Sequence, residues 1–198
     1  MTPDDGELIQ QISRMDSKAF DDLYDKYKSS VYRFAIFLTQ NREEADDLFQ
    51  ETWLRVVQYL PRTANVRDFK AWTFTITANL HRDALRKKRI RRLFFSRKSI
   101  DTDLKDGISD HSLSSEKSPI TNESDRVDIG IAISRAVADL SPRQRRVFVL
   151  KEIEGFKHSE VSEILHLPVG TIKSLMHRAV KRLQRDLSDY GPGVKCSS

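Results

Sequence analysis

Residues 69–92 constrain the fold more than any other part of the chain. The first half of this segment holds three aromatic residues, and the second half holds seven arginines and lysines, from Arg82 to Arg92. Its apolar residues recur at the spacing of one helix face: Phe69, Trp72, Ile76 and Leu80. A helix that is buried at its start and cationic at its end can lie along a phosphate backbone. The alternative is a basic helix end that only faces solvent.

Composition narrows the class of protein. The chain has 198 residues and a net charge of +5, which favours a polyanionic partner. Its single cysteine, Cys196, rules out a disulfide within the chain and fits a reducing compartment. The start of the sequence is acidic and no apolar run approaches 18 residues. We therefore expect a cytoplasmic protein without membrane insertion and without a cofactor.

Helical spacing of apolar residues continues along nearly the whole chain, so we expect an all-α fold. Three helices are predicted in the N-terminal half, over about 18–39, 42–60 and 67–92. Asn41 is the expected N-cap of the second helix, with acidic residues in the first turn where the helix dipole favours them. The residues predicted to point inward from this helix are Ala45, Leu48, Phe49, Trp53, Val56 and Val57.

Composition changes sharply at residues 99–128. This segment holds eight acidic and three basic residues, a net charge of −5, and it is rich in serine. Such a composition predicts a flexible linker between two small helical domains, and an ordered acidic loop is the alternative.

The helical pattern returns after the linker, over about 131–140, 143–152, 159–165 and 169–187. Pro142 suits a first helical turn, Gly155 is expected to break a helix, and Ser159 is expected to cap the third segment. The last two helices have the spacing of a helix-turn-helix, joined at residues 166–168. The outward residues of the last helix are Thr171, Lys173, Ser174, His177, Arg178 and Lys181. They are the predicted DNA contacts, with base readers near the start of the helix.

Three short motifs carry a resemblance to a known family. The first runs from Asp46 to Trp53, and the second is Phe69-Lys70-Ala71-Trp72 followed by Ile76, Asn79, Asp83 and Arg86. The third is Gly170-Thr171-Ile172-Lys173-Ser174 followed by His177-Arg178-Ala179. The chain thereby resembles the extracytoplasmic-function (group IV) sigma factors of bacterial RNA polymerase, over roughly residues 18–92 and 131–187.

The resemblance implies an organisation in five parts. Residues 1–17 would be an N-terminal extension, 18–98 region 2, 99–128 the linker, 129–188 region 4, and 189–198 a disordered tail. Region 2 would dock on the polymerase clamp and open the minus-ten promoter element. Region 4 would read the minus-thirty-five element and touch the polymerase flap. The function implied is transcription initiation with core RNA polymerase and promoter DNA as partners, and no catalysis.

The resemblance also implies which residues of region 2 make contacts. Polymerase would meet Asp47, Gln50, Glu51 and Leu54, which share one helix face at i, i+3, i+4 and i+7. The minus-ten DNA would meet Thr63, Asn65, Asn79, Arg82 and Arg86. Trp72 and Phe74 could stack on bases, although a core position is the competing interpretation for Trp72.

Other interpretations stay open at this point. A helix-turn-helix regulator that acts without polymerase is the main alternative, and a nuclease that uses the acidic residues at 43–47 is another. No histidine accompanies those acidic residues, so we expect no metal site there. The five scattered histidines are expected at surface or cap positions. Leu175 and Val180 stand where the family often has arginine.

The family also suggests how such a chain is controlled. Family members are commonly held by an anti-sigma factor that covers both domains. We therefore expect such a partner here, a monomer when partners are absent, and a location at the nucleoid or, through the anti-sigma factor, at the membrane.

Overall fold

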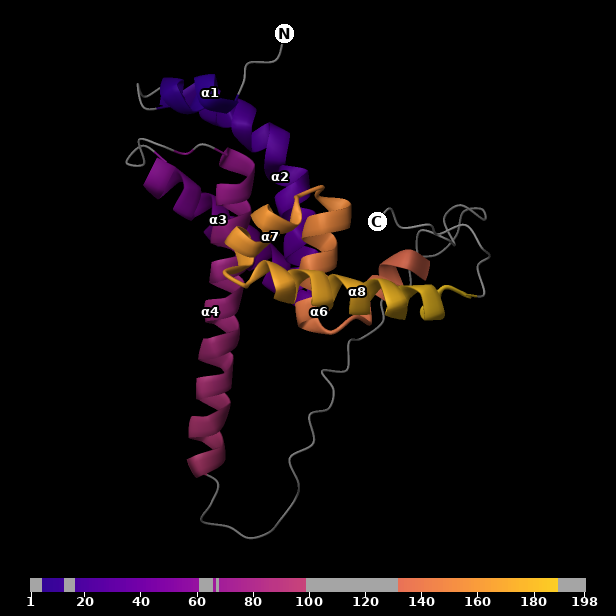
Figure 1. The fold of residues 1–198 in the computed structure, drawn as a ribbon. Helices are drawn as coiled ribbons and strands as arrows, with labels where there is room; N and C mark the ends of the chain where they lie inside the picture. Colours follow the sequence, from indigo (N-terminus) through magenta and orange to yellow (C-terminus); the bar gives the residue numbers. More distant parts are fainter. Residues whose placement is uncertain (1–4, 13–16, 61–65, 67, 99–131, 189–198) are drawn as a thin grey trace.

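The computed structural model describes residues 5–12, 17–60, 66, 68–98 and 132–188, and all regular structure within these ranges is helical (Figure 1). The elements are α1 (Asp5–Ile12), α2 (Ser17–Thr39), α3 (Arg42–Tyr59), α4 (Phe69–Lys98), a helix over 132–138, α6 (Pro142–Phe148), the π-helix η2 (Val149–Ile153), α7 (His158–Leu165) and α8 (Val169–Asp186). The predicted all-α class is confirmed. The predicted linker at 99–128 and tail at 189–198 lie outside the described residues.

Helices α2, α3 and α4 form the N-terminal half. Their apolar stripes meet because each has large side chains at i, i+3 and i+4, and Leu23, Phe34 and Phe74 are fully buried where the helices meet. Helix α1, which we did not predict, adds Leu8, Ile9 and Ile12 to the same core. The spacing of these three residues in an otherwise polar segment was the signal for it.

The turn between α2 and α3 follows from local chemistry. Gln40 has a left-handed backbone with φ of 57°, and Asn41 caps α3 by accepting a hydrogen bond from the Glu44 amide at 3.0 Å. Glu43 and Glu44 lie in the first turn, where they complement the helix dipole. The predicted cap is confirmed.

Helix α4 is buried at its start and exposed along its second half, as the sequence indicates. Phe69 and Phe74 are fully buried, whereas every described side chain from Arg82 to Lys87 is exposed. The helix runs six residues beyond the expected end at Arg92. Figure 1 shows it projecting from the rest of the protein as a long rod.

Local signals also determine where the helices of the C-terminal half begin and end. Ser141 and Gln144 form a capping box at the start of α6, with Pro142 at the first helical position. Gly155 ends the π-helix with φ of 79°, and His166 makes the left-handed turn between α7 and α8 with φ of 53°. The expected Ser159 cap is wrong, because α7 begins at His158 and Lys157 takes the N-cap position. The Lys157 amide donates instead to Glu160 Oε2 at 2.7 Å.

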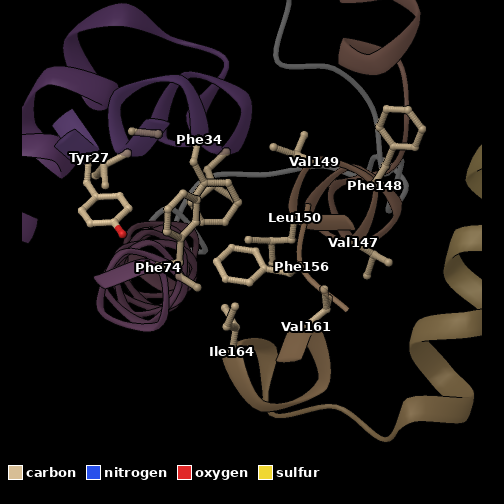
Figure 2. Close-up of a cluster of buried hydrophobic side chains, with 14 of the residues drawn as sticks. Tyr27, Phe34, Phe74, Val147, Phe148, Val149, Leu150, Phe156, Val161 and Ile164 are labelled. Atoms are coloured by element: carbon tan, nitrogen blue, oxygen red, sulfur yellow. The ribbon is translucent and has the colours of Figure 1, made fainter. Parts of the chain in front are cut away.

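The two halves share one hydrophobic core. Figure 2 shows Phe34 and Phe74 of the N-terminal half meeting Leu150, Phe156 and Ile164 of the C-terminal half. These residues are all buried. The two helical units predicted from sequence therefore pack directly against each other.

Candidate polymerase and nucleic-acid interfaces

The predicted polymerase strip lies along the outer face of α3. Asp47, Gln50 and Leu54 are exposed and Glu51 is half-exposed, so all four side chains reach the surface on one face. Glu51 pairs with Arg55 through Oε1 and Nε at 2.9 Å. Leu54 is 56% exposed and adds an apolar side chain to this polar strip.

Val57 extends this strip and corrects the sequence prediction. It was expected to point inward, but it is 51% exposed, three residues after Leu54 on the same face. Val56 is fully buried, as predicted, and Val57 lies about 100° further around the helix, on the side that faces away from the core. Two exposed apolar side chains beside three polar ones form a mixed surface suited to a partner helix.

The predicted minus-ten residues that the structure describes lie along α4. Arg82 and Arg86 are exposed one turn apart, and Asn79 is half-buried one turn before them. Their spacing puts them on one face of the helix. Thr63 and Asn65 lie outside the described residues.

Of the two aromatic residues predicted to stack on bases, Phe74 is excluded in this structure because it is fully buried in the core. Trp72 is half-buried and packs against the core, with its ring 6.1 Å from that of Phe69.

Helix α8 presents the face predicted to read DNA. Lys173, Ser174, His177, Arg178 and Lys181 are exposed, and Thr171 is half-buried at the start of the helix. The opposite face is held in the core by Ile172, Met176, Ala179 and Leu183. Helices α7 and α8 thus form a helix-turn-helix whose second helix carries an uninterrupted polar and cationic outer face.

Comparison with known proteins agrees with this arrangement. Residues 23–91 match the family model described as Sigma-70 region 2, and residues 131–183 match Sigma-70, region 4. The chain is 30% identical over 184 residues to the ECF RNA polymerase sigma factor BldN of Streptomyces coelicolor, covering 92% of this chain and 66% of BldN. It is 29% identical over 182 residues to the ECF RNA polymerase sigma factor SigW of Bacillus subtilis, covering 91% of this chain and 95% of SigW. The chain belongs to the ECF sigma factors.

Solved structures place the fold in the same family. The sigma factor RpoE of Bartonella quintana, in complex with the anti-sigma factor NepR, is 27% identical with a TM-score of 0.63, over 86% of this chain and 98% of RpoE. CnrH in complex with the cytosolic domain of CnrY has a TM-score of 0.62 over 94% of this sigma factor and 99% of that chain. The second likeness, at 22% identity, concerns the fold alone.

The two departures of this sigma factor from the family pattern in α8 have a structural reason. Leu175 and Val180 are half-buried and pack against the core. An apolar side chain at these positions is stabilised by burying its surface against the core, whereas a charged side chain would lose that stabilisation. The exposed cations of α8 are Lys173, Arg178, Lys181, Arg182 and Arg185.

The acidic residues of α3 have structural roles. Asp46 accepts a hydrogen bond from Tyr32 Oη at 2.8 Å, and Glu44 pairs with Lys88 Nζ of α4 at 2.6 Å. In the ranges that the structure describes, no three His, Cys, Asp or Glu side chains come together in a way that could hold a metal ion. Among the same residues, no helix combines the length and apolarity needed to cross a bilayer.

His81 corrects the expectation that each histidine would lie at a surface or cap position. Its side chain is buried where α4 meets the C-terminal half, and Nδ1 has no hydrogen-bond partner among the described residues. Burial lowers its pKa to about 4, and the charge of Arg146 acts in the same direction. Arg146 lies near enough to Arg82 for the two charges to repel. The interface between the halves therefore concentrates positive charge beside the predicted minus-ten face.

Proposed function

We propose a division of labour within this sigma factor, in which region 2 docks on polymerase and opens DNA, and region 4 reads the upstream promoter element. As an ECF sigma factor, the chain is an initiation factor that directs RNA polymerase to promoters. It belongs to a class of regulatory factors and not of enzymes. The observation that carries the proposal is the order of the two matched regions in one chain, each with an exposed face of suitable chemistry.

Docking is assigned to the α3 strip. Asp47, Gln50, Glu51 and Leu54 would contact the polymerase clamp, with Val57 extending the apolar part of the contact. Exposed apolar residues flanked by polar ones support this assignment. Binding would bury their apolar surface, and the polar neighbours keep the free protein soluble.

Promoter contacts are assigned to α4 and α8. Asn79, Arg82 and Arg86 would meet the minus-ten element together with Thr63 and Asn65. The α8 residues Thr171, Lys173, Ser174, His177, Arg178 and Lys181 would read the minus-thirty-five element. Exposed cations spaced by one helical turn support both assignments, because such side chains can follow a phosphate backbone.

An anti-sigma factor is the proposed regulatory partner, and a position within group IV is the proposed subclass. RpoE of Bartonella quintana was solved in complex with the anti-sigma factor NepR, and its likeness to this chain covers both regions. A partner that contacts both regions at once would gain from the raised effective concentration of its second contact. Such a partner could hold the sigma factor in the cytoplasm or at the membrane.

Run-off transcription tests the function directly. Purified core polymerase is combined with the full chain on a library of promoter fragments, and enriched transcripts define both promoter elements. We expect transcription from a subset of promoters that share two spaced motifs. Polymerase that gains no promoter activity from the chain, together with autonomous duplex binding by the chain alone, would contradict the proposal and favour a regulator that acts without polymerase.

A further inference from the structure

Glu154 of region 4 is a buried carboxylate whose cationic partners come from region 2. Its side chain is 2% exposed, and Oε1 accepts hydrogen bonds from Arg33 Nε at 3.1 Å and Arg33 Nη2 at 2.9 Å. Its backbone oxygen accepts a third from Lys70 Nζ at 2.5 Å. A buried carboxylate is costly unless it is paired, and an opposite charge is what offsets that cost. Region 4 thus carries a charge that region 2 neutralises.

Phe156 makes an apolar contact beside this ion pair. It is 4% exposed, and its ring meets that of Phe74 at a centroid distance of 5.3 Å (Figure 2). Lys70 Nζ lies 4.7 Å from the centre of the Phe156 ring, so the same lysine serves both neighbours. Gly155, with its φ of 79°, makes the turn between Glu154 and Phe156.

The segment that carries these two residues is anchored within region 4. The Glu154 amide donates to Val149 O at 2.9 Å and the Phe156 amide donates to Leu150 O at 3.0 Å. The first of these bonds spans five residues, as in the π-helix η2, a rare geometry found often at functional sites. The segment is therefore held in shape by its own region and presents Glu154 and Phe156 to the other.

A second bridge lies one helical turn further along α2. Arg145 is buried in α6, and its Nη1 donates to Phe37 O near the end of α2 at 3.1 Å. Its Nη2 donates to Ala138 O at 2.6 Å and Leu140 O at 3.0 Å within region 4. One guanidinium group thus ties α2 to two elements of the C-terminal half.

We propose that these contacts form a clasp that holds the free sigma factor in a closed, self-inhibited form. The clasp consists of Arg33, Lys70 and Phe74 of region 2 with Arg145, Glu154 and Phe156 of region 4. The inhibitory role rests on the function proposed above. Closure itself requires no inhibitor protein, because the groups that contact the Glu154 carboxylate and the Phe156 ring belong to this chain.

Promoter geometry explains why closure inhibits. Elements centred near positions −35 and −10 lie about 25 base pairs apart, which is roughly 85 Å of duplex. Region 4 packed on α2 and α4 cannot reach one element while region 2 holds the other. The thirty residues at 99–128 can span at most about 100 Å when fully extended, enough for the opened chain. Binding to polymerase and promoter must therefore release the clasp, and the closed fraction lowers the apparent affinity.

Arg33→Ala tests the clasp with little risk to either region, since Arg33 lies on the surface of α2 with 47% of its side chain exposed. It leaves Glu154 buried without its ion-pair partner, so the closed form is destabilised. Lys28→Ala is the matched control, because Lys28 is exposed on the same helix and its ion pair is with Asp25 of that helix. Arg33→Ala with Glu154→Met removes both charges and should restore closure.

The distance between the regions is measured first. Nitroxide labels are placed on Asp83→Cys of α4 and Glu163→Cys of α7, both exposed, in a Cys196→Ser background. Dipolar spectroscopy should give one narrow distance for the parent chain and the Lys28→Ala variant. Arg33→Ala should broaden it toward longer distances, and the double variant should narrow it again. A broad distribution in the parent chain, or no change in Arg33→Ala, would overturn the clasp.

The apparent affinity for core polymerase is measured next on the same chains without labels. Arg33→Ala should bind core polymerase about three- to tenfold more tightly than the parent chain, because a larger fraction of its molecules is open and competent to bind. Lys28→Ala should bind with the affinity of the parent. An opened variant with parental affinity would overturn the inhibitory role. If no chain, parent included, binds core polymerase, the proposed function fails and the inhibitory role fails with it, while the distances still decide the clasp.

Discussion

The ring of Phe156 meets the ring of Phe74 edge to face, with centroids 5.3 Å apart and planes at 70°. Phe74 belongs to α4 and Phe156 lies between η2 and α7, so this contact joins residues from the two sigma regions. Both rings are buried, and aromatic pairs of this geometry add stability beyond the area they bury. The two regions are consequently expected to unfold as one cooperative unit.

Truncation of this contact tests that coupling. Phe156→Ala should lower the free energy of unfolding by about 3–5 kcal/mol, because it removes a buried ring and leaves a cavity. Urea denaturation followed by circular dichroism measures the change. Phe156→Leu, which fills most of the volume, should cost less. Two separate transitions in the unmodified chain would show that the shared core does not couple the regions.

The α3 strip predicts a change in polymerase binding without a change in fold. Gln50→Ala combined with Glu51→Arg should weaken binding to core polymerase. The lost Glu51–Arg55 pair is exposed on both sides, so it should cost at most about 0.5 kcal/mol of stability. Co-purification with core polymerase gives the readout, with Asp22→Ala on the exposed face of α2 as the control. Unchanged binding alongside an unchanged helical spectrum would exclude this strip as the docking surface.

The exposed face of α8 predicts separable effects on sequence preference and on affinity. Lys173→Ala should change the preferred base at one position of the upstream element, at a cost of about 1–3 kcal/mol. Arg178→Ala should weaken binding to all sequences and reduce the salt slope by about one. Holoenzyme binding to labelled promoter duplexes at several salt concentrations distinguishes the two. Gln184→Ala, exposed further along α8, is the control, and identical behaviour of all three variants would mean that another face reads the DNA.

His81 predicts how closure responds to pH. Burial and the charges of Arg146, Lys88 and Arg145 lower its pKa from 6.5 to about 4, against the opposing charge of Glu44. The closed form therefore prefers neutral imidazole. Above pH 6.5 the group is neutral whether the regions are closed or open, so it contributes no pH dependence. As pH falls from 6.5 toward 4, the open form takes up a proton and the closed form does not, so closure weakens.

Nuclear magnetic resonance of the imidazole protons measures this response. The His81 resonance should titrate near pH 4 in the unmodified chain and move toward 6.5 in the opened Arg33→Ala variant. Lys28→Ala should leave it in place. A His81 pKa near 6.5 in the unmodified chain would contradict its burial between the regions.

Local signals in the sequence predicted most of the helices and which residues of α8 face outward, although α1 was missed. Asn41 as a cap, Pro142 at a first turn and Gly155 as a break all act within a few residues of where they stand. The outward face of α8 also follows from spacing, because a period of 3.6 residues separates its core side from its exposed side. The family resemblance then supplied the order of the two sigma regions, which the family models confirm.

Only the tertiary structure decided which apolar and charged side chains remain exposed to solvent. Val57 and Val56 are equally apolar, and only the packing of α3 places one outside and the other inside. Likewise, His81 and Phe74 are buried where the C-terminal half meets α4, which no spacing within α4 predicts. Arg33 and Glu154 are 121 residues apart. The spacing of apolar residues shows only which side of a helix is apolar, because that pattern involves residues three and four positions apart. Which helix faces pair with each other depends on the shape and charge of the assembled core.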